Sequence, residues 1–566
     1  MSRKELFLKF IKKHWQLSLF SIVLGFFASV LTLLIPIALG KYFDLMFAYH
    51  SRRAQVLDMF PFSFWENMSQ FLLFFIFLVV LQFFITYAFR YFTALSGERF
   101  SKFLRELLFT HQLWIPLATY EAKGTGKYLL RYSGDMRSAQ NLFTKGVLRL
   151  ASDLLILLLA LGFMWWFDVW VSSIVMGSLI IAILIVVWLN KHLRKVSITR
   201  RNRRSLLLAF VSERLRAIAS LRAFNRYTPE ILKFKKKSDG LYEIGSRYHA
   251  IYQLIYTIVP GLLYGVLTAT LVVIYLRSEA HPQLLHSGNV LAYILLFLTI
   301  MPVIRRLLRA GLVWEMGLIS IDKLRTVLTQ ATFESDRPAF HFKKGKIEAE
   351  ALTFCWNKEK NVFNSLFFEI APKSLFLFKG RPGSGKSTLL KLMMGLLIPT
   401  RGRIFIDGQD VSKVNGFSLR KYMTAVSPEF PLLGKTVFEA ISYNKKKRNR
   451  TRAQKLLAHF QQDLPEEMRL QLDMPIGELG SRLSSGEIKL LQYLRAIMTR
   501  KPILLIEEPF KGLHAKVRPY IVQWLKEQHK ERTIVLFSTS SNLQGLKANN
   551  TFALKQIPLD AISTTT

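Results

Sequence analysis

Gly380 to Ser387 reads GRPGSGKS, and this stretch decides the fold of the second half of the chain. It satisfies the pattern GxxxxGK[ST] and lies between the apolar segment SLFLF and the apolar segment TLLKLMMGLL. Glycines let the backbone curl so that its N–H groups surround a phosphate, while the lysine reaches the phosphate oxygens and the serine hydroxyl ligates Mg²⁺. The stretch predicts a strand, a phosphate-binding loop and a helix.

The residues expected to contact a nucleotide follow from this loop. They are Gly380, Gly383, Ser384, Gly385, Lys386, Ser387 and Thr388. A second apolar segment, PILLIEEP, ends in Glu507 and Glu508. Carboxylates at the end of a buried strand beside a phosphate loop can hold a metal and polarise an attacking water. We therefore expect Ser387 and Glu507 at a metal, with Lys386 and Glu508 as catalytic residues.

The first half of the chain has a different character. Of the 566 residues, 51% are hydrophobic and 20% are charged, a mixture expected when lipid-buried helices share a chain with a soluble domain. Six apolar segments are long enough to cross about 30 Å of hydrocarbon. They lie near 16–40, 70–92, 147–167, 169–190, 251–276 and 289–312.

Basic residues indicate the orientation of these segments. Lys and Arg crowd the N-terminus and the stretches 93–146 and 191–250, which places those parts in the cytoplasm. The net charge is +40, and much of this positive charge is interpreted as lying on side chains that face anionic lipid headgroups. Nucleic acid is not expected as a partner, because no groove-reading motif accompanies the charge. Cys355 is the single cysteine, which excludes an intrachain disulfide.

Two domains are expected. Residues 1–330 form an all-α membrane domain of about six helices with long cytoplasmic extensions, and residues 331–566 form an α/β P-loop nucleotide-binding domain with short strands separated by Gly, Pro and Asp turns. The protein is expected to be a multi-pass cell-membrane protein with its N-terminus and nucleotide-binding domain in the cytoplasm.

Nearly the whole chain resembles an ABC transporter of the exporter type. The resemblance rests on the phosphate loop, on ILLIEEP, and on the stretch IGELGSRLSSGE, Ile476 to Glu487, here called the signature segment. LWIPLATYEAKGTGKYLLRYSGDM resembles the family's first coupling segment, with Gly126, Arg131 and Asp135 after it, and residues 217–226 resemble the second. Trp356 stands where the family places an aromatic residue against adenine.

This resemblance implies a dimer that binds ATP and Mg²⁺. ATP would lie between the phosphate loop of one subunit and the signature segment of the other, where Ser484 and Gly486 contact the γ-phosphate. Closure on ATP would switch the membrane helices from inward-open to outward-open, with export as the direction.

Several positions depart from the family pattern. The metal-associated Asp is Glu507, Pro428 replaces a Gln, Thr539 replaces the switch His, and His514 replaces an Asp. Within the signature segment, Ser485 and Glu487 stand for a Gly and a Gln. We therefore expect ATP binding with slow or absent hydrolysis at this subunit's own site.

Two alternatives stay open. A heterodimer with a second, catalytically intact half-transporter is favoured over a homodimer, and a pseudo-ATPase that regulates or completes a membrane complex is the rival to a transporting subunit. The substrate is not identified. Pro302 is expected to break or kink the last membrane helix, and Arg305, Arg306 and Arg309 after it suit an anionic amphipath or structural pairing.

Overall fold

The protein is described by a computed structural model that divides the chain into two compact units. The first comprises residues 1–113 and 123–330, and the second residues 114–122 and 331–566. The residues described are 3–47, 68–123, 128–129, 131–167, 169–280, 287–330, 337–357, 360–443, 447–540, 543 and 545–554.

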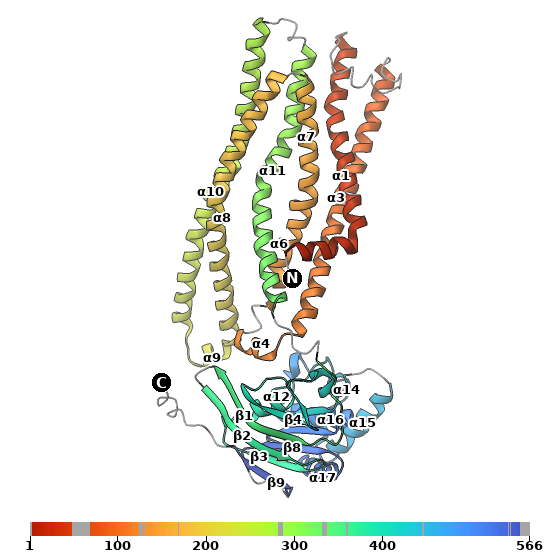
Figure 1. The fold of residues 1–566 in the computed structure, drawn as a ribbon, viewed down its shortest axis with the longest axis vertical. Helices are drawn as coiled ribbons and strands as arrows, with labels where there is room; N and C mark the ends of the chain where they lie inside the picture. Colours follow the sequence, from red (N-terminus) through yellow and green to blue (C-terminus); the bar gives the residue numbers. More distant parts are fainter. Residues whose placement is uncertain are drawn as a thin grey trace. The chain divides into compact units, whose positions relative to one another are not determined.

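Six long helices build the first unit (Figure 1). They are α1 (Arg3–Phe47), α3 (Met68–Leu113), α7 (Arg149–Phe167), α8 (Val169–Arg216), α10 (Tyr227–Ala280) and α11 (Ser287–Leu328). The short helices α6 (Met136–Asn141) and α9 (Ile218–Ala223) join them, with π-helical turns on either side of α6. Helix α8 has 48 residues. At 1.5 Å per residue it is about 70 Å long, more than twice the hydrocarbon thickness.

Hydropathy and length agree with a membrane domain. Five of the helical stretches in the described part of the chain are long and apolar enough to span a membrane, and each overlaps one of the first five predicted segments. The sixth predicted segment, 289–312, lies in α11. The side chains in the first turns of α11 are not described. Helix α11 continues through Pro302. The expected break at this proline therefore does not occur.

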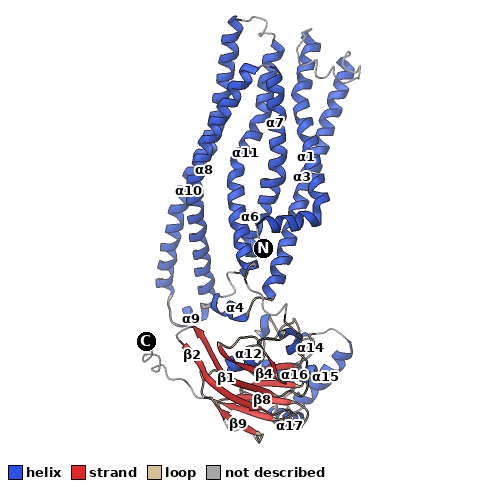
Figure 2. Cartoon of the chain, viewed as in Figure 1, coloured by secondary structure: helices blue, strands red, loops and turns tan. Residues whose placement is uncertain are grey.

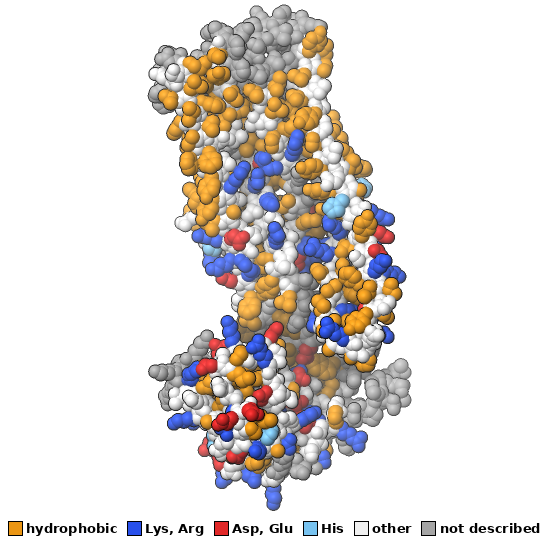
Figure 3. Space-filling model, turned by 180° about the vertical axis from the view of Figure 1, so that it is seen from behind, with side chains coloured by type: hydrophobic (Ala, Val, Ile, Leu, Met, Phe, Trp, Pro, Cys, Tyr) orange, Lys and Arg blue, Asp and Glu red, His pale blue; other side chains and the backbone are white. Residues whose placement is uncertain are grey.

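The outside of this unit is apolar, as a lipid-facing surface must be. Leu73, Phe83 and Leu184 expose 70%, 67% and 63% of their surface. Figure 3 shows hydrophobic side chains over the upper part of the unit and Lys and Arg side chains along its lower part.

The motif after the first coupling segment forms a buried ion-pair network. Asp135 is paired with Arg131 at 2.7 Å and also with Arg201, which donates to Ser320 at 3.0 Å. Pairing is required because a buried carboxylate without a partner is costly. Gly126 of the same motif lies outside the described residues.

The second unit contains two sheets (Figure 2). The antiparallel sheet has the order β2-β1-β4-β5, from β1 (Ile347–Asn357), β2 (Lys360–Ile370), β4 (Arg401–Ile406) and β5 (Gln409–Asp410). The parallel sheet has the order β6-β7-β8-β3-β9, from β3 (Leu375–Lys379), β6 (Met423–Val426), β7 (Ile503–Glu507), β8 (Thr533–Ser538) and β9 (Asn550–Ala553).

Helices accompany these sheets. They are α4 (Leu117–Lys123), α12 (Lys386–Met393), α13 (Gly416–Arg420), α14 (Val437–Ser442), α15 (Lys447–Gln461), α16 (Ser485–Thr499) and α17 (Arg518–Gln528). Strand β3 leads into α12 through the phosphate loop, as predicted. In such parallel sheets, ligands bind beyond the carboxyl ends of the strands. Glu507, the last residue of β7, therefore lies at the edge where a ligand is expected.

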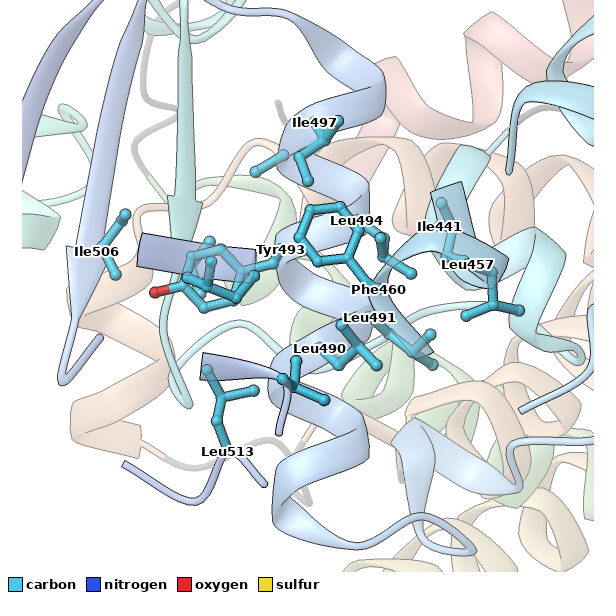
Figure 4. Packing of buried hydrophobic residues seen from close by; sticks show 14 of the residues in the cluster. Ile441, Leu457, Phe460, Leu490, Leu491, Tyr493, Leu494, Ile497, Ile506 and Leu513 are labelled. Atoms are coloured by element: carbon cyan, nitrogen blue, oxygen red, sulfur yellow. The ribbon is translucent and has the colours of Figure 1, made fainter. Parts of the chain in front are cut away.

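Helix α16 is anchored in the larger of two apolar cores of this unit (Figure 4). Leu490, Leu491 and Leu494 of α16 pack with Phe460 of α15 and with Ile441 of α14. This helix begins directly after the signature segment's Ser484, so the core fixes where that segment lies.

Candidate functional site

The phosphate loop has the backbone that its glycines predict. Gly383 and Gly385 adopt φ values of +84° and +89°, in the region that favours glycine. A Cβ on Gly385 would lie 2.6 Å from the ring of Phe363, and one on Gly380 would lie 2.3 Å from Ser384 Oγ. Larger side chains at Gly380 and Gly385 would therefore distort the loop.

Lys386 lies folded back on this loop. Its Nζ donates to the carbonyl oxygens of Gly380 at 2.8 Å and Arg381 at 3.1 Å, and it lies 3.8 Å from Glu508 Oε1. Burial lowers the pKa of Lys386, although Glu508 and Glu507 oppose this shift. The ammonium group is thus held at the loop by two main-chain oxygens, with a carboxylate nearby.

Ser384 and Gly380 are not among the loop residues that line the adjacent cavity. The Ser384 hydroxyl is buried beside Gly380 and has no hydrogen-bond partner in the described structure. The loop borders a cavity of about 930 Å³ that Lys386, Ser387 and Thr388 also line. The residues present therefore fit a nucleoside phosphate.

The metal-binding prediction concerns Ser387 and Glu507, which are in contact. Ser387 Oγ donates to Glu507 Oε1, and Ser427 Oγ donates to Glu507 Oε2. Among the described residues no cluster of three or more His, Cys, Asp and Glu side chains could hold a metal. Mg²⁺ keeps waters and commonly binds through one or two carboxylates plus substrate phosphates, so Ser387 and Glu507 fit it only together with a nucleotide.

Ser427 was not predicted. It follows β6, whose Val426 pairs with Ile506 of β7, so it lies beside Glu507 at the same sheet edge. Its position directly after the short strand MTAV was the available signal.

Glu508, the expected general base, is bound by Thr539. The Thr539 backbone N–H donates to Glu508 Oε1 at 3.0 Å, and the Thr539 hydroxyl lies 3.3 Å from Oε2. Glu508 has a φ of +48° and its own N–H donates to the Phe537 carbonyl at 2.7 Å. Both carboxylate oxygens therefore have protein donors at the end of β8.

Pro428 lines the nucleotide cavity within a tight turn. Gln492 of α16 donates to the carbonyl oxygens of Ser427 at 2.9 Å and Phe430 at 3.1 Å, which ties this turn to the helix. A proline ring offers neither a donor nor an acceptor there. The Pro428 side chain therefore contributes shape but no hydrogen bond at this wall of the cavity.

Lys489 is a second buried lysine at the cavity and was not predicted. Only 5% of its surface is exposed, and its Nζ donates to the main-chain oxygen of Glu507. Burial lowers the pKa of Lys489 to about 8, against the opposing effect of Glu507 and Glu508. Lys489 lies on α16, four residues after Ser485. The sequence did not indicate that it reaches the cavity, because this depends on how α16 packs.

Trp356 also lines the cavity, at the end of β1. It is 40% exposed and meets Phe354 edge-on at 5.2 Å. An exposed indole at the rim of a phosphate-loop cavity suits the predicted stacking on a base.

Ser484 and Gly486 do not line this cavity. They line a neighbouring cavity of about 390 Å³, together with Glu487, Gly512 and His514, and Ser485 and Gly512 line both cavities. Ser484 and Glu487 form a capping box, in which the Glu487 carboxylate accepts from the Ser484 N–H and hydroxyl at 2.7 Å each. The Glu487 carboxylate therefore caps its own helix.

Lys391 connects three segments of the second unit. Its Nζ is 2.9 Å from Glu121 of α4 and 2.9 Å from Glu429, which follows Pro428. The lysine lies on α12, the helix that starts at the phosphate loop. The ion pairs therefore join the first coupling segment to both the phosphate-loop helix and the turn at Pro428.

A further cavity, of about 550 Å³, lies in the first unit. Its charged lining residues are Arg90, Lys145, Arg149 and Arg306, against Glu98 and Asp153. Arg306 pairs with Asp153 at 2.6 Å, and Glu98 accepts from Gln140 at 2.8 Å. No described carboxylate forms an ion pair with Arg90, Lys145 or Arg149. Arg305 does not line this cavity, and the Arg309 side chain is outside the described residues.

A P-loop nucleotide-binding domain fused to a membrane-spanning helical domain defines the class of this protein. Family models match both parts: the ABC transporter transmembrane region over residues 18–303 and the ABC transporter domain over residues 363–511. The chain belongs to the ABC transporter family, with the fused domain order of its exporters.

Relatives and a solved structure agree. An ATP-dependent lipid A-core flippase of Nitrosococcus oceani is 25% identical over 452 residues, covering 78% of this chain and 74% of the relative. The leukotoxin translocation ATP-binding protein LktB of Bibersteinia trehalosi is 25% identical over 472 residues, covering 82% and 65%. The fold matches a bacterial Atm1-family ABC exporter with ATP bound, at a TM-score of 0.76, 19% identity, and coverage of 96% and 94%.

Proposed function

We propose that this chain is one subunit of a dimeric ABC exporter whose own site binds ATP with Mg²⁺ and hydrolyses it slowly. The observation that carries the proposal is the cavity of about 930 Å³ that the phosphate-loop residues Lys386 and Ser387 line, with Ser387 in contact with Glu507. ATP binds the closed conformation more tightly than the open one. This difference in binding free energy drives the change in conformation of the membrane helices.

Slow hydrolysis is supported by what surrounds the attacking position. Pro428 and Thr539 line the cavity where the family has a Gln and a His, so two side chains that contact the metal, water or γ-phosphate are missing. Glu508 remains but is hydrogen-bonded to Thr539. Each missing transition-state contact of this kind costs about 10²–10³-fold in rate.

A dimer is supported by the chain's membership of the ABC transporter family and by its match to an ABC exporter. Leu479 and Ser485 of the signature segment line the cavity of their own phosphate loop, but Ser484 and Gly486 do not, so we propose that these two residues contact the nucleotide of a second subunit. Because this chain's own site is impaired, we favour a heterodimer with a catalytically intact half, with the homodimer as the alternative.

The proposed substrate is an anionic amphipath, such as a lipid with a phosphorylated headgroup. The membrane-unit cavity contains three basic side chains, Arg90, Lys145 and Arg149, that form no ion pair with a described carboxylate, although Asp153 at the same cavity attracts Arg149. Charges inside a membrane domain require a partner or water. The Thr93 hydroxyl at the same cavity is buried and lacks a hydrogen-bond partner. Lipid A-core, named in the flippase relatives, belongs to this chemical class.

The chain is placed in the cell membrane as a multi-pass protein with its nucleotide-binding domain in the cytoplasm, because the basic stretches 93–146 and 191–250 belong on that side.

Transport of a labelled lipid tests the proposal. Proteoliposomes containing the chain and its co-purifying half should flip a fluorescent phosphatidic acid in the presence of ATP, and Arg149→Gln should slow this by about tenfold, whereas Arg105→Gln, on an exposed arginine outside the cavity, should not. ATP binding without any lipid movement would favour the pseudo-ATPase alternative, which the losses at Pro428 and Thr539 also support.

A further inference from the structure

Lys489 has donors that the protein does not satisfy. An ammonium group carries three N–H bonds, and in the described structure Lys489 uses one of them, to the Glu507 main-chain oxygen. The residue is nearly fully buried and lines the nucleotide cavity. A buried cation with free donors at the wall of a cavity requires an anionic or oxygen-rich ligand there.

The charge balance of the cavity depends on this residue. The lining contains three lysines, Lys386, Lys489 and Lys511, and two glutamates, Glu507 and Glu508, so its net charge is +1. Without Lys489 the lining would be neutral. The anionic groups of the metal site are therefore offset by the protein itself before any divalent cation binds.

The position of the charge also matters. Lys489 Nζ donates to the main-chain oxygen of Glu507, the residue expected to hold Mg²⁺, while Lys386 Nζ donates to a main-chain oxygen of the phosphate loop. The cavity is thus lined by two buried lysines that are held by different segments. Charges in such a partly desolvated site interact more strongly than exposed ones such as Lys511.

We propose that Lys489 is a built-in cation of the nucleotide site, which lets this subunit retain a nucleoside triphosphate without a divalent metal ion. The inference rests on the proposed nucleotide-binding function and deepens it: the metal-free triphosphate becomes a ligand of this site, and Lys489 is its specificity-determining residue.

The test is equilibrium binding of a fluorescent ATP analogue to the full chain in lipid nanodiscs, in Mg²⁺ and in EDTA. For the wild type, the Kd in EDTA should be within about tenfold of the Kd in Mg²⁺. Lys489→Met, which keeps the length of the side chain, should weaken binding in EDTA by at least about tenfold and change binding in Mg²⁺ much less. Lys413→Met, on an exposed lysine of the same domain that does not line this cavity, should leave the ratio of the two Kd values unchanged.

Lys489→Arg keeps the positive charge and should keep metal-free binding. Because Lys489 is buried, thermal unfolding without nucleotide checks that each variant folds. If a variant does not fold, the ratio of the wild-type Kd values in EDTA and Mg²⁺ still tests whether this subunit binds the triphosphate without a metal ion. A wild-type Kd at least about 100-fold weaker in EDTA overturns the inference, as does a ratio that Lys489→Met leaves unchanged. Absence of binding in Mg²⁺ would instead overturn the proposed function, and Lys386→Met is the reference for that loss.

Discussion

The backbone N–H of Thr539 donates to Glu508 Oε1 over 3.0 Å, so the carboxylate expected to activate water is bound by the residue that replaces the family's switch His. The Thr539 hydroxyl lies 3.3 Å from the other carboxylate oxygen. Thr539 therefore donates to both oxygens of the Glu508 carboxylate and offers no imidazole.

Replacing Thr539 by His should partly restore hydrolysis. The backbone N–H would still position Glu508, while the imidazole would supply the missing contact to the γ-phosphate. We expect the ATPase rate of the chain to rise at least about tenfold, since a donor aimed at the transition state contributes about 10²–10³-fold. Steady-state phosphate release measures it, and Thr539→Ser, which keeps a hydroxyl, is the control. An unchanged rate in Thr539→His would show that another departure, such as Pro428, limits hydrolysis.

Glu487→Gln tests the capping box at the start of α16. The Glu487 carboxylate accepts both the N–H and the hydroxyl of Ser484, so a neutral amide should weaken the cap by roughly 0.5–1 kcal/mol. It should also release the Ser484 hydroxyl for the partner subunit's nucleotide. We expect a slightly lower melting temperature together with tighter ATP-dependent dimerisation, followed by light scattering. Weaker dimerisation would contradict this role of Glu487.

Lys391→Met should disconnect the first coupling segment from the nucleotide-binding domain. The substitution leaves Glu121 and Glu429 without their shared cation, but both carboxylates are partly exposed, so the loss of stability should be about 1 kcal/mol or less. ATP affinity should therefore be retained while ATP-driven lipid transport falls. Lys413→Met, on an exposed lysine of the same domain, serves as the control. Equal losses of ATP affinity and transport would mean that Lys391 supports the fold, not the coupling.

Local patterns made the fold and the phosphate loop predictable. GRPGSGKS specifies its own backbone, because the positive φ values of Gly383 and Gly385 follow from nearby residues. The apolar segments likewise carry their own length signal, and the α/β class followed from short strands punctuated by turns.

What could not be predicted depends on contacts between distant segments. Ser427 reaches Glu507 only because β6 is the neighbour of β7, and Lys489 reaches the same residue because an apolar core positions α16. Glu121 and Lys391 are 270 residues apart in the chain. No periodicity or motif encodes such pairs, since strand order and helix packing are decided by the whole domain.

The most direct test of the central claim is the ATP turnover of the purified chain in lipid, measured together with ATP binding. We predict saturable ATP binding that Lys386→Ala abolishes, and a turnover well below roughly 1 s⁻¹, the low end of typical enzymes, that Glu508→Gln hardly changes. Turnover of about 1 s⁻¹ or more should appear only when a catalytically intact half is added. Turnover of about 1 s⁻¹ or more by the chain alone, abolished by both substitutions, would contradict the claim and identify a homodimer with two working sites.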